Sequence, residues 1–430
     1  MLDQTRAGAA AICAQTVFEI SEHDRATLKP LAARVAELAA QPEQAKKRER
    51  WQRINTLKKP DRPIILCDPE NGWNEIITED QIECSGELAR QWEMSLRKEI
   101  FWGESMGDDR VIEPKFVVGH VVSEETDWGL QAEKHSGGAG GSYVWDAPIR
   151  SYDEDLPKLR FPSLRVDAAK TADLLSLACD VLGAHLSVTL RSQWWWTLGM
   201  TWTCITLRGL QQMMLDMCME PDNLKKLMTF LRDGTLAQLD YLQANGLLGL
   251  NNDGTYVGSG GFGYTTELPQ DDFDGEHVRT MDMWGFCESQ ETTQVSPAHF
   301  EEFVFPYQLP ILKRFGLNCY GCCEPLHLRW HVVKRFPRLR RISVSPWADL
   351  SAMAGYLTDQ YIFSMKPSPS PLAVPSLDHD HIRAGLHQAF DVTRGCLVEA
   401  IMKDNHTIGG NPQNVIDWCR IAREEAENAR

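Results

Sequence analysis

The sequence predicts an α/β fold, a (β/α)8 barrel of the TIM type, and three observations point to it. Short apolar runs alternate with helical segments along most of the chain. Polar residues directly follow many of these runs, as expected where parallel strands end at a common face. The chain of 430 residues, with 43% hydrophobic residues, has enough apolar material for one large core. We therefore expect an N-terminal helical extension over residues 1–60 and a barrel domain over residues 61–430.

The sequence of the N-terminal part predicts helices, followed by the first strand of the barrel. Leu31, Val35 and Leu38 recur at helical spacing after Pro30, which suits a first helical turn. The run Arg62-Pro-Ile-Ile-Leu-Cys-Asp-Pro-Glu is apolar and bounded by prolines, as in a buried parallel strand. A helix over 85–106 and a strand over 115–122 follow.

A long polar, glycine-rich tract extends from Ser123 to about Phe161 and contains His135-Ser-Gly-Gly-Ala-Gly-Gly141. It has neither helical nor strand periodicity. Tracts of this length without periodicity are usually functional lids or mobile loops. We expect a long inserted loop region here.

The C-terminal two thirds continue the alternation of strands and helices. Gly183 and Gly246 end two of the helices, as glycine often does. The expected helices cover 167–183, 224–246, a segment beginning at Ser296-Pro297, 328–336 and 414 onward. The expected strands cover 185–190, 247–254, the residues before Cys319, 339–346, 361–367 and 396–403, and an apolar segment with a polar tip covers 281–290.

Charge and composition exclude some functions. The net charge of -16 argues against nucleic-acid binding, which relies on clustered Lys and Arg. The apolar patch over 7–13 is too short for a signal-peptide core or a membrane span. The twelve irregularly spaced cysteines indicate reduced thiols. We expect a cytoplasmic protein without a membrane partner.

Two motifs resemble ligand-binding signatures but have simpler structural explanations. Gly258-Ser-Gly-Gly-Phe-Gly263 matches GxGxxG, but Tyr-Thr-Thr-Glu-Leu-Pro269 follows it and does not begin a helix. This segment predicts a flexible loop and no dinucleotide site. Asp378-His-Asp-His381 resembles a metal-binding tract, yet it precedes a helical pattern and more simply caps that helix.

The cysteine cluster is the strongest chemical signal. Cys319, Cys322 and Cys323 lie within five residues and precede Glu324. A structural zinc site lacks a second ligand pair, and a redox dithiol lacks an adjacent helix that would lower the thiol pKa. An open catalytic metal site would combine these thiols with a ligand from another strand, which barrel geometry favours. Buried inert cysteines remain the alternative.

Other candidate residues follow predicted strands. Trp194, Trp195, Trp196 and Trp202 form either core packing or an aromatic wall against a substrate. Asp253 and Glu288 end two strand-like segments, while Glu399 and Lys403 belong to the last strand. Asp404-Asn-His-Thr-Ile-Gly409 matches the DxHxxG signature of corrinoid-binding modules, but too little chain follows for such a module. His406 is therefore either a ligand or acid at this strand end or an exposed loop histidine.

Several landmarks in order resemble the uroporphyrinogen decarboxylase superfamily, which includes cobalamin-dependent methyltransferases. The resemblance covers residues 60–425. It rests on Arg62-Pro-Ile-Ile, on Arg208-Gly209 with Asp216 and Pro221, on Asn252-Asp-Gly254, on Tyr320-Gly-Cys-Cys-Glu-Pro325 and on Asn411-Pro-Gln-Asn-Val415.

The resemblance implies a zinc site and argues against one reaction. The methyltransferases carry an H-x-C pair, which places Tyr320 at the histidine position and Cys322 at the cysteine, with a third ligand near 404–406. Cys323 or Glu324 would supply the missing ligand.

The decarboxylases carry an arginine-rich loop where this chain has Cys67-Asp-Pro-Glu-Asn-Gly-Trp73. Acids in that loop would repel a polycarboxylate, so uroporphyrinogen decarboxylation is disfavoured.

The resemblance thus favours a corrinoid-dependent methyltransferase of the O-demethylase type. Its methyl donor would be small, for example a methoxylated aromatic ring against Trp194, Trp195, Trp196 and Trp202. The corrinoid would belong to a partner protein, and a lyase or decarboxylase acting on a tetrapyrrole or other carboxylated substrate is the alternative. The candidate catalytic residues are Asp253, Glu288, Glu399 and Lys403, and the candidate zinc ligands are Cys322, Cys323, Glu324 and His406.

Overall fold

The computed structural model describes residues 18–136 and 143–429, and a six-stranded parallel sheet forms the centre of its mixed α/β fold. The strand order is β1-β12-β11-β10-β9-β8. Most of these strands are buried along their whole length, which explains their continuous apolar sequences. The bounds are β1 (Ile64–Cys67), β8 (Trp284–Cys287), β9 (Leu317–Tyr320), β10 (Leu339–Val344), β11 (Ile362–Met365) and β12 (Leu397–Met402).

A second parallel pair, β2 (Lys115–Val118) and β7 (Ser187–Leu190), is separate from this sheet. The strands predicted over 62–70, 115–122, 185–190, 339–346, 361–367 and 396–403 are confirmed, in shorter form. The predicted short strand at the cysteine cluster is confirmed as β9, which contains Cys319 and ends before Cys322 and Cys323. The segment over 281–290 contributes β8.

Side chains complete both edges of the six-stranded sheet. At the β1 edge, Asp109 donates its N–H to the Ile65 carbonyl and accepts the Ile65 N–H through Oδ2, both at 2.8 Å. At the β8 edge, the Asn251 amide donates to the Trp284 carbonyl at 3.0 Å and accepts its N–H at 2.9 Å. The strand predicted over 247–254 is wrong, because a side-chain amide makes the bonds that a strand backbone would make. A closed eight-stranded barrel stays a prediction.

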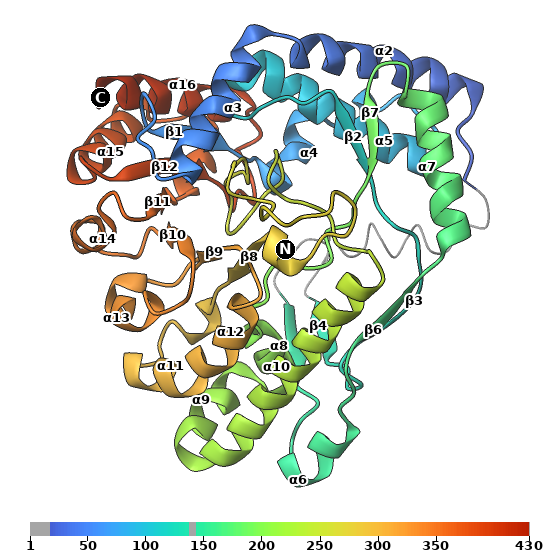
Figure 1. The fold of residues 1–430 in the computed structure, drawn as a ribbon. Coiled ribbons are helices and arrows are strands. Elements are labelled where there is room, and N and C mark those ends of the chain that lie inside the picture. Colours follow the sequence, from blue (N-terminus) through green and yellow to red (C-terminus); the bar gives the residue numbers. More distant parts are fainter. Residues whose placement is uncertain (1–17, 137–142, 430) are drawn as a thin grey trace.

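Helices surround the sheet, and Figure 1 shows several of them on the outer side of the arc that the strands follow. None of the helices within 18–136 and 143–429 is long and apolar enough to cross a membrane. Their bounds are α2 (Glu22–Ala39), α3 (Pro42–Asn55), α4 (Trp73–Ile76), α5 (Glu87–Phe101), α6 (Tyr152–Asp155), α7 (Ala168–Leu182), α8 (Thr201–Arg208), α9 (Leu210–Met219), α10 (Pro221–Ala244), α11 (Pro297–Phe303), α12 (Phe305–Leu312), α13 (Trp330–Val333), α14 (Leu350–Leu357), α15 (His379–Val392) and α16 (Gln413–Asn428).

Short helical turns connect these elements. The predicted helix over 85–106 is α5 followed by a π-helical turn, and the helix predicted over 328–336 is only the short α13. The turns are η1 (Glu70–Gly72), η2 (Glu79–Gln81), η3 (Trp102–Met106), η4 (Leu156–Lys158), η5 (Thr280–Asp282), η6 (Gln290–Thr292), η7 (Leu326–Leu328) and η8 (Ser370–Leu372).

Local capping sets the start of several helices. Asp378 accepts the His381 N–H at 3.0 Å and begins α15, so its predicted role as a helix cap is confirmed. Asp167 caps α7 and Ser296 caps α11 in the same way. These helix starts follow from the local sequence alone.

The predicted loop over 123–161 contains strands, so that prediction is wrong in part. β3 (Val122–Thr126) pairs antiparallel with β6 (Ser163–Val166), and β4 (Glu133–Ser136) pairs antiparallel with β5 (Tyr143–Asp146). Residues 137–142, which include most of the glycine-rich stretch, lie outside the described residues. β3 is mostly exposed and polar on both faces, so hydrophobic alternation gave no sign of it.

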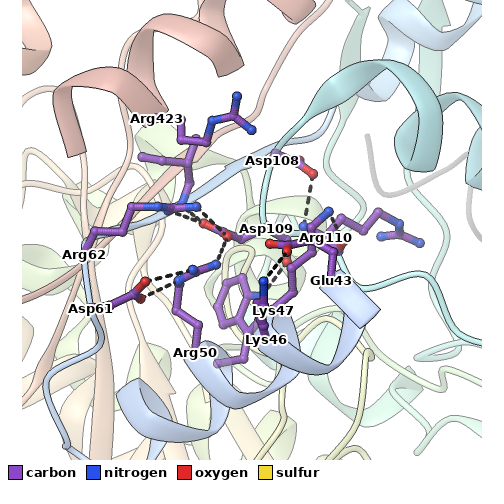
Figure 2. A network of polar contacts seen from close by, with 12 residues as sticks. Glu43, Lys46, Lys47, Arg50, Asp61, Arg62, Asp108, Asp109, Arg110 and Arg423 are labelled. Carbon is purple, nitrogen blue, oxygen red and sulfur yellow. Dashed lines mark hydrogen bonds and ion pairs between the residues drawn. The ribbon is translucent and has the colours of Figure 1, made fainter. Parts of the chain in front are cut away.

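A buried ion network ties α3 to the edge of the sheet (Figure 2). Asp109 lies between Arg50 and Arg62, at 2.6 and 2.7 Å. Burial would raise the pKa of Asp109, but the two guanidinium groups hold it below its usual value. Asp61 pairs with Arg50 from the exposed side at 2.7 Å. The N-terminal helices are thus anchored to the strands by charge as well as by packing.

Candidate functional site

A cavity of about 810 Å³ lies at the carboxyl ends of the central strands. Asp68 follows β1, Gln290 follows β8, Cys322 follows β9 and Lys403 follows β12, and all four side chains line the cavity. Ligands bind at this end of parallel strands because the loops that follow them converge there. The cavity is therefore the candidate active site.

The tryptophan wall, Trp194, Trp195, Trp196 and Trp202, lines this cavity, and each ring also packs against the protein. The Trp194 indole donates to the Leu247 carbonyl at 2.7 Å. Trp195 meets Phe315 edge-on, Trp196 meets Phe286 edge-on, and Trp202 contacts Trp145. These half-buried rings pack against the core and also form one side of the cavity. Their contact with a substrate stays a prediction.

The structure adds aromatic residues that sequence reasoning missed. Trp73 and Trp102 come from the first βα unit, Trp284 and Phe286 from β8, and Tyr256 from the loop after α10. They lie far apart in the sequence and share no motif. Only tertiary folding brings them to the same cavity.

Cys322 and Cys323 form a thiol pair on the cavity wall. Their sulfurs are 3.7 Å apart, and the Ser259 hydroxyl donates to the Cys322 Sγ at 3.3 Å. Gly321 begins this turn with φ +93°, a conformation that side chains rarely adopt. The hydrogen bond between the thiols lowers the pKa of Cys323 and, with burial, raises that of Cys322. Cys323 is therefore the more acidic thiol of the pair.

The other two predicted metal ligands do not join this pair. Glu324 is buried, and its two oxygens accept the N–H groups of Ser289 and Cys322, both at 2.8 Å. This carboxylate fixes the thiol turn against the end of β8. His406 is exposed and does not line the cavity. The sequence correctly placed it after the last strand but could not orient it.

The thiol pair fits part of a zinc site. Two thiolates on a tetrahedral zinc lie about 3.8 Å apart, since each Zn–S bond is about 2.3 Å, and the observed separation is 3.7 Å. A catalytic zinc also needs a third protein ligand. In the described part of the chain, the only group of three such ligands with atoms within 4.8 Å of one another is Glu133, His135 and Asp146, exposed on β4 and β5. The donor set at the thiol pair is therefore incomplete for zinc.

Lys403, Glu70 and Asp404 form the charged part of the cavity wall. The Lys403 Nζ lies 2.8 Å from Asp404 and 3.8 Å from Glu70. Burial raises the pKa of Glu70 to about 7, although Lys403 opposes the shift. Glu70 and Asp404 both have positive φ, at 49° and 62°, and such strain often marks functional sites. Glu70 is thus a titrating acid in the cavity, a role that its sequence position did not reveal.

Of the four predicted catalytic residues, only Lys403 lines the cavity. Asp253 pairs with Lys115 and Arg191, both at 2.9 Å. Burial would raise its pKa, but these cations lower it to about 2. Asp253 is held as an anion that orients Arg191.

The remaining two predicted acids lie within the protein interior. Glu399 accepts from Arg341 at 2.9 Å and from the Ser364 hydroxyl. Glu288 is fully buried, and burial together with the neighbouring Glu291 raises its pKa well above the usual value. The structure brings neither side chain to the cavity.

The glycine loop over 258–263 is packed against the strands, so the prediction of a flexible loop is wrong. Val257 donates its N–H to the Gly261 carbonyl at 2.9 Å, and Tyr256 and Phe262 form a bridge. A Cβ on Gly258 would lie 2.8 Å from the Cβ of Cys319. The glycines let this loop approach the inward-facing side chains of the sheet.

Comparisons with known proteins identify no family. No family model matches the sequence, and no curated protein matches it. Among solved structures, the fold is similar to a methyltransferase from Methanosarcina mazei, with 11% sequence identity and a TM-score of 0.48. The similarity covers 88% of this chain and 98% of that chain. A likeness at this level does not establish a shared activity.

Proposed function

We propose that this protein is a methyltransferase that moves a methyl group from a small methylated donor to the cobalt of a separate corrinoid protein. The cavity carries the proposal, because a tryptophan wall and a charged wall with an amine, acids and thiols meet at the carboxyl ends of the strands. The ordered landmarks shared with the uroporphyrinogen decarboxylase superfamily support the same class of reaction.

The protein's own residues would orient the donor and exclude water. The tryptophan wall offers flat apolar surfaces that hold a small donor, a methoxylated aromatic ring included, in one orientation. The partner's corrinoid supplies the nucleophile that accepts the methyl group. For an ether donor, the leaving oxygen needs a proton, and Glu70 is the cavity acid whose pKa of about 7 suits that transfer. Lys403, whose Nζ lies 3.8 Å from Glu70, would stabilise the carboxylate that forms when Glu70 gives up its proton.

No step of this proposal depends on zinc. Cys322 and Cys323 are the residues that would hold the ion, and it would act there as a Lewis acid on the leaving atom. A third ligand would have to come from a rearranged side chain or from the donor itself. The cofactor therefore stays a proposal that metal analysis of the purified protein tests.

The alternative is a lyase acting on a carboxylated substrate, which the cavity cations Lys98, Arg191 and Lys403 favour. Arg191 and Lys403 are already paired with Asp253 and Asp404, at 2.9 and 2.8 Å. The acids Asp68 and Glu70 also face this cavity, as the sequence of the first loop predicted. These acids disfavour a substrate with several carboxylates.

The proposal is tested by mixing the protein with reduced cobalamin and a panel of methyl ethers, methylamines and methyl thioethers. We expect methyl transfer from at least one donor, seen as loss of the cobalt(I) absorbance and release of the demethylated product. Trp347→Leu is the matched control, because Trp347 is 74% exposed and outside the cavity. No transfer from any donor, together with carbon dioxide release from a carboxylated substrate, would overturn the proposal in favour of the lyase.

A further inference from the structure

The cavity is unusually rich in indole rings. Seven of the protein's 14 tryptophans line it: Trp73, Trp102, Trp284 and the four of the tryptophan wall. Core packing alone would bury these rings completely, yet the four of the wall are only half-buried. The rings therefore present surface to whatever occupies the cavity.

The protein itself uses three of these indoles to hold cations. Lys98 lies 5.5 Å from the Trp73 ring centre, the Arg110 guanidinium 3.8 Å from Trp102, and the Arg341 guanidinium 5.3 Å from Trp284. The negative face of an indole attracts cations, and tryptophan does so best among the aromatic residues. Within 18–136 and 143–429, no lysine or arginine lies over a ring of the tryptophan wall in this way. Those rings remain available to a cation from outside.

Carboxylates on the same cavity supply a counter-charge. Asp68 and Glu70 line it, and Asp68 is held in place by the Tyr256 hydroxyl at 2.8 Å. The Glu70 carboxylate lies 3.8 Å from the Lys403 Nζ, which is too long for a hydrogen bond, so this ion pair is loose. The Asp404 backbone is a second polar contact of the carboxylate. Aromatic rings combined with a carboxylate are the usual surroundings of a bound quaternary ammonium group.

We infer that the cavity binds a quaternary ammonium compound carrying N-methyl groups, with the cation held by the tryptophan wall and Glu70. The inference rests on the proposed function only for the compound's role as methyl donor. This donor class needs no Lewis acid, which agrees with the incomplete set of zinc ligands at the thiol pair. When a methyl group leaves a quaternary nitrogen, the C–N electron pair stays on nitrogen and the product is a neutral tertiary amine. Cobalt(I) provides the pair for the new Co–C bond and becomes cobalt(III), so the step balances without a proton or a Lewis acid.

A binding experiment on the full-length protein tests the inference. Choline is compared with 3,3-dimethylbutan-1-ol, which has the same shape and hydroxyl group but no charge, by isothermal titration calorimetry. We expect choline to bind at least tenfold more tightly than its uncharged analogue, because only the cation gains from the indole faces and the carboxylate. Equal affinities would overturn the inference, and so would tighter binding of a methoxylated aromatic such as 2-methoxyphenol.

Matched variants locate the site. Trp196→Leu and Glu70→Gln should each weaken choline binding at least fivefold and leave the uncharged analogue nearly unaffected. Trp347→Leu should change neither affinity, since Trp347 is 74% exposed and lies outside the cavity. Thermal unfolding of each variant shows whether it is folded. Unchanged choline affinity in folded Trp196→Leu and Glu70→Gln would overturn the inference.

The failures of the inference and of the proposed function are distinguishable. Selective choline binding without methyl transfer to cobalamin from any donor would support the binding site and remove the proposed function. Methyl transfer from ethers, without selective choline binding, would support the function and overturn the inference.

Discussion

Two acids, the buried Asp109 and the partly buried Glu70, show how the same chemical group serves different ends in this protein. Asp109 is enclosed by Arg50, Arg62 and two backbone contacts with Ile65, and its pKa is held below the usual value (Figure 2). Glu70 has one loose ion pair with Lys403, and burial raises its pKa to about 7. The fully paired acid is a structural anchor, while the poorly paired acid lies on a cavity and can change its charge.

The largest expected effect comes from breaking the structural network. Asp109→Asn should destabilise the protein by about 3–5 kcal/mol, because it leaves the buried Arg62 guanidinium without its anion and Arg50 with only the exposed Asp61. Urea unfolding monitored by tryptophan fluorescence measures the change. Asp61→Asn is the matched control, because the Asp61 side chain is 56% exposed and such a pair contributes at most about 1 kcal/mol. Equal effects of the two variants would contradict the comparison.

Next in size is the effect of Glu70 on turnover. With an ether donor, Glu70→Gln should lower the rate by about 10²-fold, since a positioned general acid contributes that much or more. With a quaternary ammonium donor, it should mainly raise KM. Steady-state kinetics with both donor classes separates the two outcomes, and Lys403→Met tests whether the ion pair positions the acid.

The titration of Glu70 with pH also separates its two roles, as an anion that binds a cationic donor and as an acid for an ether donor. Lys403, Asp404 and Asp68 are the charged groups that face Glu70, and its pKa is about 7. The affinity for a cationic donor should rise as the pH increases through about 7, because Glu70 becomes an anion. The rate with an ether donor should fall over the same range, because the acid loses its proton. In Glu70→Gln both transitions should vanish. A pH profile that is the same in the variant would assign the titration to another group.

A smaller effect is expected at the thiol pair. Cys323 should react with iodoacetamide about tenfold faster than the exposed Cys179, because its hydrogen bond with the Cys322 thiol lowers its pKa. Cys322→Ala should reduce this advantage. Peptide mass spectrometry after short exposures measures the rates. Faster labelling of Cys179 would contradict the lowered pKa of Cys323.

The smallest expected effect is the change in zinc content when His406 is replaced. We expect His406→Ala to leave the zinc content of the purified protein unchanged, because His406 is exposed and away from the cavity. Cys322→Ser should remove any zinc that the thiol pair holds. Elemental analysis of both variants beside the unmodified protein measures this. Loss of stoichiometric zinc in His406→Ala would show that the last loop rearranges to supply the third ligand.

The sequence by itself determined the elements whose signals are local. The apolar runs of β1, β10, β11 and β12 predicted buried strands, and Asp378 predicted the start of α15. The thiol pair and Lys403 were also found from the sequence, because polar residues after parallel strands meet at one end of the sheet.

Only the tertiary structure decided how these elements close around a site. Asn251 and Asp109 complete the sheet edges through side chains, which no periodicity reveals. Glu324 was predicted as a metal ligand but accepts two backbone N–H groups, while Glu70, with its pKa raised to about 7, lies on the cavity. The physical reason is that hydrophobic patterns and caps act over a few residues. The partner of a buried charge comes from a distant segment, and only the folded chain determines which partner it meets.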